Sequence, residues 1–104
     1  MGVSRAFGVD WSRMLFLTKY TFIGDRSPES ARELVKEFGQ RGAAPGEVAH
    51  YVNADGSGGY VITDSDDVQG AYANALAYQQ WIKFETTTIL TIADALPSIM
   101  AAFG

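Results

Sequence analysis

The chain contains one histidine, His50, and histidine is the side chain that ordinarily exchanges protons near neutral pH. The alternating segment around it predicts a strand in which Val48, His50 and Val52 share one face. In a pocket, the imidazole would serve as general base for a phenol, an enol or an activated carbon acid, while a tyrosine hydroxyl polarised the substrate. Exposure on an edge strand, or burial in a dimer interface, explains the same position equally well.

Four aromatic side chains that carry a polar atom are the candidates for holding a planar ligand. They are Tyr20, Tyr60, Tyr72 and Trp81. In an enzyme, one of the three tyrosines would orient the ligand toward His50. Core packing is the competing interpretation, and it is the commoner role for residues of these types.

A glycine-rich segment shortly after His50 has some features of an ion-binding loop. Residues 53–64 can be aligned with a twelve-residue calcium loop, but Asp55 and Asp64 are their only charged residues and the flanking segments have the composition of strands. A phosphate-binding loop would join a strand to a helix, whereas this cluster joins two strands. We therefore expect a β-hairpin turn, and neither a metal nor a cofactor.

Composition excludes several kinds of site and partner. The 104 residues include no cysteine, which removes disulfides, thiolate metal sites and cysteine nucleophiles. The net charge is −4 and the eight basic residues are scattered, so no basic stripe predicts a nucleic-acid partner. No apolar run approaches the roughly 20 residues that cross a bilayer. We expect a cytoplasmic protein without a membrane partner.

The periodicity predicts one domain over residues 14–104. Residues 1–13 show no periodicity and are predicted to be a disordered N-terminal extension, with Met14 as an alternative natural start. Strands are predicted at residues 14–22, 48–52, 60–63 and 82–92. One helix follows the N-cap Ser27 and a second starts at Ser65. A short terminal helix is predicted over 94–104, with Asp94 as N-cap and Pro97 in the first turn.

The order strand, helix, strand, strand, helix, strand is the split βαβ arrangement of ferredoxin-like α+β folds. It predicts a four-stranded antiparallel sheet with the first and third strands central and both helices on one face. The other face would then expose apolar side chains. Face-to-face association of two copies would cover it, which predicts a homodimer, or a larger homo-oligomer, that forms a dimeric α/β barrel. The apolar stripe of the terminal helix also needs a cover, and a partner subunit would provide one.

Three segments of this chain resemble a family of short bacterial domains of unknown function in the dimeric α/β barrel superfamily. They are MLFLTKYTF, HYVNADGSGGYVITDSDD and YQQWIKFETTTIL, and the resemblance covers Met14 to Ile92. Family members often end the last strand with Thr-Pro-Val, whereas this chain has Thr86-Thr87-Thr88. The superfamily includes cofactor-independent monooxygenases, isomerases, polyketide cyclases and haem-degrading enzymes, together with members that have no demonstrated activity.

Two functional hypotheses follow from the residues and the resemblance. The first is a small homodimeric α/β barrel that binds a small apolar or aromatic molecule between sheet and helices. Its enzymatic form would be a cofactor-free monooxygenase, isomerase or cyclase with His50 as acid/base. The second is a non-catalytic structural or regulatory oligomerisation domain whose cavities are filled by its own side chains. An open pocket beside His50 and a tyrosine would favour the first.

Overall fold

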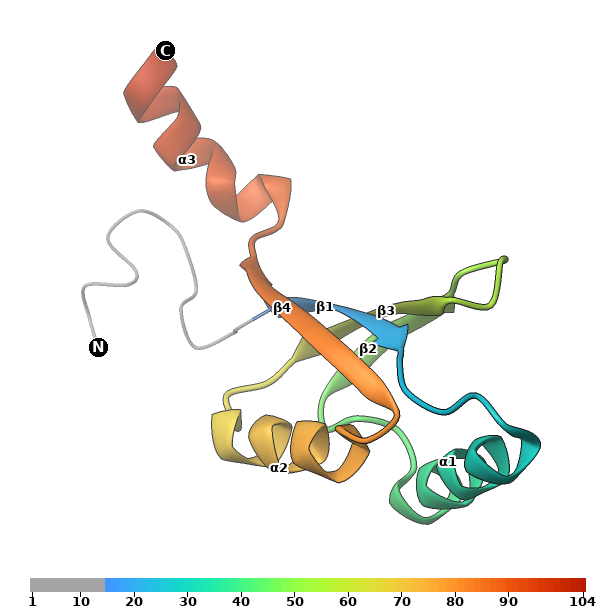
Figure 1. Cartoon of the computed structure of the whole chain (residues 1–104). Coiled ribbons are helices and arrows are strands. Elements are labelled where there is room, and N and C mark those ends of the chain that lie inside the picture. The colour runs from blue at the N-terminus through green and yellow to red at the C-terminus, as the bar shows by residue number, and fades with distance from the viewer. Residues whose placement is uncertain (1–14) are drawn as a thin grey trace.

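A four-stranded antiparallel sheet organises residues 15–104, the part of the chain that the computed structural model describes. The predicted extension over residues 1–13 lies outside this part. In chain order the elements are β1 (Leu15–Phe22), α1 (Pro28–Arg41), β2 (Glu47–Val52), β3 (Gly58–Asp64), α2 (Val68–Tyr78), β4 (Ile82–Ile89) and α3 (Ile92–Phe103). The sheet order β2-β3-β1-β4 places β1 and β3 in the centre (Figure 1), which confirms the predicted ferredoxin-like α+β fold.

Short-range hydrogen bonds define where the first two helices begin. The Ser27 hydroxyl accepts the Ser30 N–H, and Pro28 occupies the first turn of α1, as predicted. For α2, the cap is Asp67 rather than Ser65, and its carboxylate accepts the Gly70 N–H at 2.8 Å. The Ser65 hydroxyl instead accepts the Asp67 N–H and forms a turn before the helix. The helix therefore begins at Val68, three residues later than the sequence indicates.

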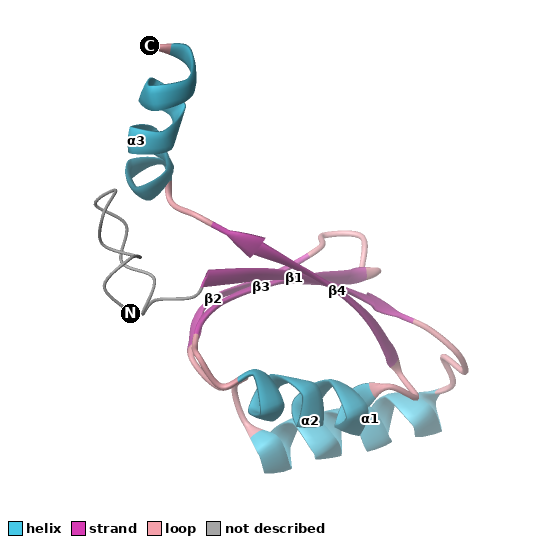
Figure 2. Cartoon of the chain, turned by 90° about the vertical axis from the view of Figure 1, so that its left-hand side faces the viewer, coloured by secondary structure: helices cyan, strands magenta, loops and turns pink. Residues whose placement is uncertain are grey.

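Both α1 and α2 lie on one face of the sheet, as Figure 2 shows. Because side chains alternate along a strand, the register assigns Tyr20 and Phe22 of β1 and Phe84 of β4 to the helix-covered face. Lys19 and its cross-strand partners Tyr60 and Glu85 lie on the opposite face. No described element covers that opposite face. We call it the open face.

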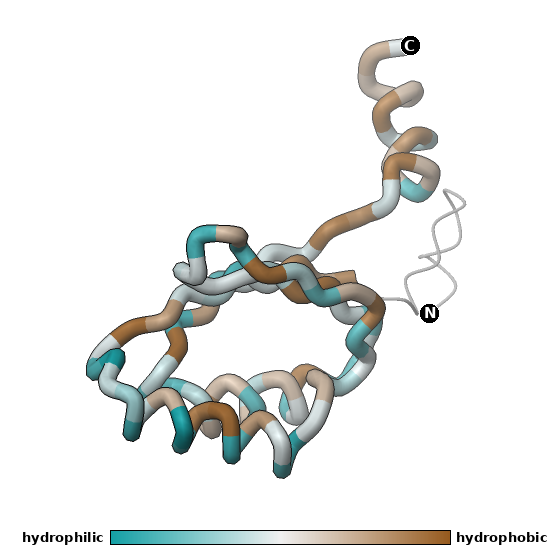
Figure 3. Tube along the Cα trace, turned by 90° about the vertical axis from the view of Figure 1, so that its right-hand side faces the viewer, coloured by the Kyte–Doolittle hydropathy of each residue, from teal (hydrophilic) through white to brown (hydrophobic). Residues whose placement is uncertain are grey.

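The terminal helix α3 projects away from the sheet and from the other two helices (Figures 1 and 2). It begins two residues earlier than predicted, because the Thr91 hydroxyl accepts the Asp94 N–H and caps it. Consequently, β4 ends at Ile89 instead of residue 92, and Pro97 lies inside the helix instead of in its first turn. Figure 3 shows α3 as largely hydrophobic along its length.

The buried core of the described chain is small. Tyr20 and Tyr78 are its only buried large side chains, at 7% and 6% exposure, and both lie between the sheet and the helices. The large apolar side chains of α3 are all exposed: Ile92, Leu96, Ile99, Met100 and Phe103. Within residues 15–104, no helix combines the length and apolar character needed to span a membrane.

Candidate functional site

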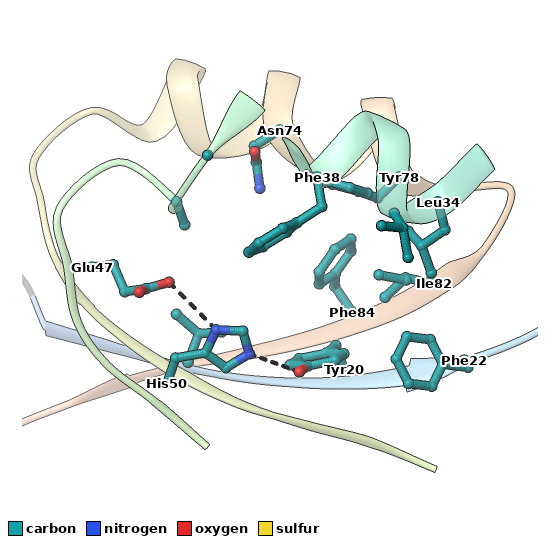
Figure 4. Close-up of a pocket in the computed structure, with 14 residues that line it drawn as sticks. Tyr20, Phe22, Leu34, Phe38, Glu47, His50, Asn74, Tyr78, Ile82 and Phe84 are labelled. Carbon is teal, nitrogen blue, oxygen red and sulfur yellow. Dashed lines mark hydrogen bonds and ion pairs between the residues drawn. The ribbon is translucent and has the colours of Figure 1, made fainter. Parts of the chain in front are cut away.

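A pocket of about 230 Å³ lies between the helix-covered face of the sheet and the helices α1 and α2 (Figure 4). Its walls are mostly apolar, and they include Leu34, Val35 and Phe38 of α1. The complete lining is Tyr20, Phe22, Leu34, Val35, Phe38, Gly42, Ala44, Glu47, His50, Val61, Asn74, Tyr78, Ile82 and Phe84. The pocket is therefore an open cavity beside His50 and a tyrosine.

A β-bulge in β2 places two ionisable side chains together in this pocket. Glu47 pairs with Thr63 and Ala49 with Ile62, so Val48 is an extra residue with no partner on β3. In a regular strand, residues three positions apart point to opposite faces. With Val48 bulged out, Glu47 and His50 instead line the same pocket. The strict alternation assumed from the sequence could not reveal this pair.

Tyr20, His50 and Glu47 form a line of polar contacts along the floor of the pocket. The Tyr20 hydroxyl lies 2.7 Å from His50 Nε2, and His50 Nδ1 lies 3.7 Å from Glu47 Oε1. The two side chains on β2 are partly exposed, 29% for His50 and 23% for Glu47, whereas Tyr20 is buried. Figure 4 shows the three groups in this order.

The environment of Tyr20 keeps its hydroxyl protonated. Burial raises the pKa of the Tyr20 hydroxyl above its ordinary value, and the negative charge of Glu47 raises it further. Tyr20 therefore holds its proton at neutral pH, and the tautomer of His50 decides which of the two groups donates the hydrogen bond. A neutral imidazole that accepts at Nε2 carries its own proton on Nδ1. That N–H is on the side of the ring that faces Glu47.

Gly59 provides the space in which Tyr20 reaches His50. Tyr20 on β1 pairs with Gly59 on the neighbouring central strand, and β2 lies beyond it. A Cβ atom at residue 59 would collide with the backbone oxygen of Tyr51, and it would lie 2.6 Å from the Tyr20 hydroxyl oxygen and 2.8 Å from Cζ. Since real Cβ atoms do not approach so closely, glycine is required here both by the neighbouring backbone and by the ring that lies across β3. The second glycine of the Gly58-Gly59 pair is thus part of the site.

The pocket has a polar end and an apolar end. Figure 4 shows Glu47 and His50 at one end, and Phe22, Leu34 and Ile82 at the other. Tyr20 packs edge-on against Phe22, with ring centroids 5.8 Å apart, and so connects the two ends. Asn74 of α2 also lines the pocket and is its one side-chain amide. Such a cavity suits a small molecule with an apolar body and one polar substituent.

The structure brings together two of the residues proposed from the sequence, Tyr20 and His50. Trp81 lines a second, smaller concavity of about 190 Å³, together with Phe22 and Arg26. Tyr60 lies on the open face. Tyr72 lies on the outer side of α2 and is 67% exposed. None of these three lines the pocket that contains His50.

Glu47, Gly59 and Asn74 belong to this site and were not predicted from the sequence. Helix α2 turns Asn74 and Tyr78 toward the sheet and leaves Tyr72, the residue proposed from the sequence, exposed. The signal for Gly59 is a glycine inside a strand, which often marks a close approach of another group.

The glycine-rich turn before β3 is held by its own side chains. The Asp55 carboxylate accepts both the backbone N–H and the hydroxyl of Ser57, at 2.9 and 2.6 Å. These hydrogen bonds lower the pKa of Asp55. Asn53 donates its side-chain amide to the same hydroxyl. Among residues 15–104, no three histidine or acidic side chains come together as a metal-ligand set.

We predict that Gly59→Ala breaks the contact between Tyr20 and His50, because the added methyl group would collide with the Tyr20 ring and with the backbone oxygen of Tyr51. The loss of packing should reduce the free energy of unfolding by roughly 1–3 kcal/mol. Urea denaturation measures this change, and the NMR signals of the His50 ring should shift. Gly39→Ala is the matched control, since nothing lies within 4 Å of its added Cβ. That substitution in α1 should stabilise by roughly 0.5–1 kcal/mol; equal behaviour of the two variants would contradict the steric argument.

We also predict that Tyr78→Phe leaves stability unchanged or raises it by roughly 1 kcal/mol. The Tyr78 hydroxyl is enclosed and has no hydrogen-bond partner among the described residues. Burial and the charge of Glu37 raise the pKa of Tyr78, against the opposing effect of Arg41, so the group stays neutral. Removing an unsatisfied donor removes its desolvation cost. A clear loss of thermal stability would instead show that the hydroxyl is hydrogen-bonded in the folded protein.

Comparison with known proteins identifies the family of the chain without assigning an activity. No curated protein matches it. A family model described as a domain of unknown function, DUF3303, matches residues 14–103. This range includes every described helix and strand, from β1 to α3, and the pocket. The chain therefore belongs to the DUF3303 family of domains of unknown function.

Proposed function

We propose that this protein binds a small apolar or aromatic molecule in the pocket between its sheet and its helices. The observation that carries the proposal is the cavity itself, about 230 Å³ in volume, with three phenylalanines among its walls and a polar group at one end. A domain with so few buried side chains gains apolar contacts when a ligand fills this space. Binding would therefore also stabilise the fold.

The chemistry that this pocket supports best is acid–base catalysis. Cofactor-free oxygenation, isomerisation and cyclisation can each begin with removal of a proton from the substrate. His50 is the candidate acid/base, and Tyr20 is the tyrosine placed to orient a ligand beside it, at 2.7 Å from Nε2. Tyr60, Tyr72 and Trp81 do not line this pocket and therefore have no part in that role.

A second candidate function is oligomerisation, and the exposed apolar surfaces favour it. The open face carries apolar side chains such as Leu17 and Ile62, paired across the central strands. It also carries Lys19 opposite Glu85, so two copies could pair unlike charges. Helix α3 exposes its apolar residues as well, and an isolated helix of 12 residues is marginal in water. We propose a homodimer in which the open faces meet and α3 is covered by the partner copy. We place this dimer in the cytoplasm.

The ligand proposal predicts that N-phenyl-1-naphthylamine, a neutral probe that fluoresces in apolar surroundings, binds the protein. In Ala44→Trp, the indole would occupy the pocket, because Ala44 lines it. We expect the affinity to fall about tenfold, the change that about 1.4 kcal/mol produces. Fluorescence titration measures both affinities.

Ala54→Trp is the control for this experiment, because Ala54 is exposed in the hairpin turn, away from the pocket. It should bind the probe as the unaltered protein does. Equal weakening by both variants, or no effect of Ala44→Trp, would place the probe elsewhere, for example on α3 or on the open face.

The homodimer predicts that Leu17→Lys lowers the dimer fraction measured by sedimentation equilibrium. The added charge would be buried between two open faces, where it has no partner. Val48→Lys is the matched control, since Val48 is exposed at the bulge, at the edge of the sheet. If the unaltered chain sediments as a monomer, the dimer is excluded. If Val48→Lys dissociates it as readily, the open face is not the interface.

A further inference from the structure

Both ring nitrogens of His50 are already directed at protein groups. Nε2 lies 2.7 Å from the Tyr20 hydroxyl, and Nδ1 faces Glu47 at 3.7 Å. Nε2 is thus already hydrogen-bonded, and a ligand oxygen at Nδ1 would meet the Glu47 carboxylate. The group better placed for a ligand is the hydroxyl of Tyr20, a residue of the pocket lining whose oxygen has a further lone pair.

We propose that Tyr20, His50 and Glu47 act as one proton-accepting relay, and that the ligand carries a weakly acidic hydroxyl, as a phenol or an enol does. This inference rests on the proposed function, since it names the class of molecule that the same pocket takes. It also changes the roles expected from the sequence, in which His50 is the acid/base and a tyrosine orients the ligand. In the relay, Tyr20 contacts the ligand and exchanges the proton, and His50 acts through Tyr20.

The proton transfer balances within the four groups. The ligand hydroxyl gives its proton to the Tyr20 oxygen as the Tyr20 proton passes to His50 Nε2. The O–H bond of the ligand breaks and an N–H bond forms, which leaves a ligand oxyanion, a neutral tyrosine and an imidazolium. Glu47 then becomes the counter-ion of the imidazolium at Nδ1. Net charge is conserved, and no further reactant is needed.

The charges around the pocket select a neutral weak acid over an anion. Glu47 is a carboxylate, and no lysine or arginine is among the described residues that line the cavity. A carboxylate or phosphate ligand would meet the negative charge of Glu47 without a counter-ion. A phenol or an enol enters uncharged. The side-chain amide of Asn74, on α2, lines the pocket and is the neutral group available to donate a hydrogen bond to the ligand oxyanion. The remaining titratable group of the lining, Tyr78, is held neutral by its raised pKa.

Glu47 is a positioning residue in this relay. Its carboxylate, 3.7 Å from Nδ1, favours a proton on that nitrogen, which leaves Nε2 to accept from Tyr20. Because its side chain is only 23% exposed, its charge acts on His50 with limited screening by water. Replacing it with the neutral Glu47→Gln should weaken proton acceptance, while Glu47→Asp, which retains the charge, should restore part of it.

The test compares 4-nitrophenol with nitrobenzene, which has the same ring and nitro group but no hydroxyl. The absorbance of 4-nitrophenol reports its ionisation, so the pH is set where the free probe is mostly un-ionised. We expect 4-nitrophenol to bind about fivefold to tenfold more tightly than nitrobenzene, as one additional hydrogen bond allows. The bound probe should show the phenolate band.

Single substitutions of the three relay residues distinguish how each contributes to the phenolate band. Tyr20→Phe and His50→Gln should abolish the phenolate band, while nitrobenzene still binds. Glu47→Gln should reduce the band, and Glu47→Asp should recover part of it. Tyr60→Phe is the matched control, because Tyr60 lies on the open face, and it should leave the band unchanged.

Two different outcomes would overturn the inference, and they can be told apart. Equal binding of both probes without a phenolate band would refute the relay and leave ligand binding in place. Binding of neither probe would refute the proposed function together with the relay. A phenolate band that persists in Tyr20→Phe would show that the ligand reaches His50 directly.

Discussion

The ring of Tyr20 can lie across β3 because residue 59 has no side chain, and the rest of the site follows from that position. The ring connects the polar end of the pocket with the phenylalanine walls and carries a hydroxyl to the edge strand. It is also one of the two large side chains that are buried in the described chain. The absence of a side chain at residue 59 of β3 therefore permits both the burial of the Tyr20 ring and its contact with His50.

The fold follows from the sequence more closely than the site does. Alternation in residues 14–22 and the cap at Ser27 with Pro28 specify β1 and α1, because these signals are local and agree with one another. His50 and Tyr20 could be named for their chemistry. Their contact depends on Gly59 and on the extra residue Val48, and neither a strand register nor a bulge is encoded by residue type alone.

The helix α2 shows a second limit of pattern analysis. Its apolar residues are spread around the helix, so Val68, Tyr72 and Tyr78 do not specify one inward side. The structure buries Tyr78 and leaves Val68 and Tyr72 largely exposed. The helix is oriented so that Asn74 and Tyr78 face the sheet and line the pocket. A polar residue on the inward side is a departure from the amphipathic rule, and such departures are common where a fold holds a site.

The bulge at Val48 has a consequence for the edge of the sheet. β2 is an outer strand, and an outer strand offers its unpaired amides and carbonyls to any other extended chain. A residue that interrupts the regular spacing of those groups makes lateral strand addition unfavourable. The irregularity that brings Glu47 to His50 therefore also protects the protein against uncontrolled edge-to-edge growth.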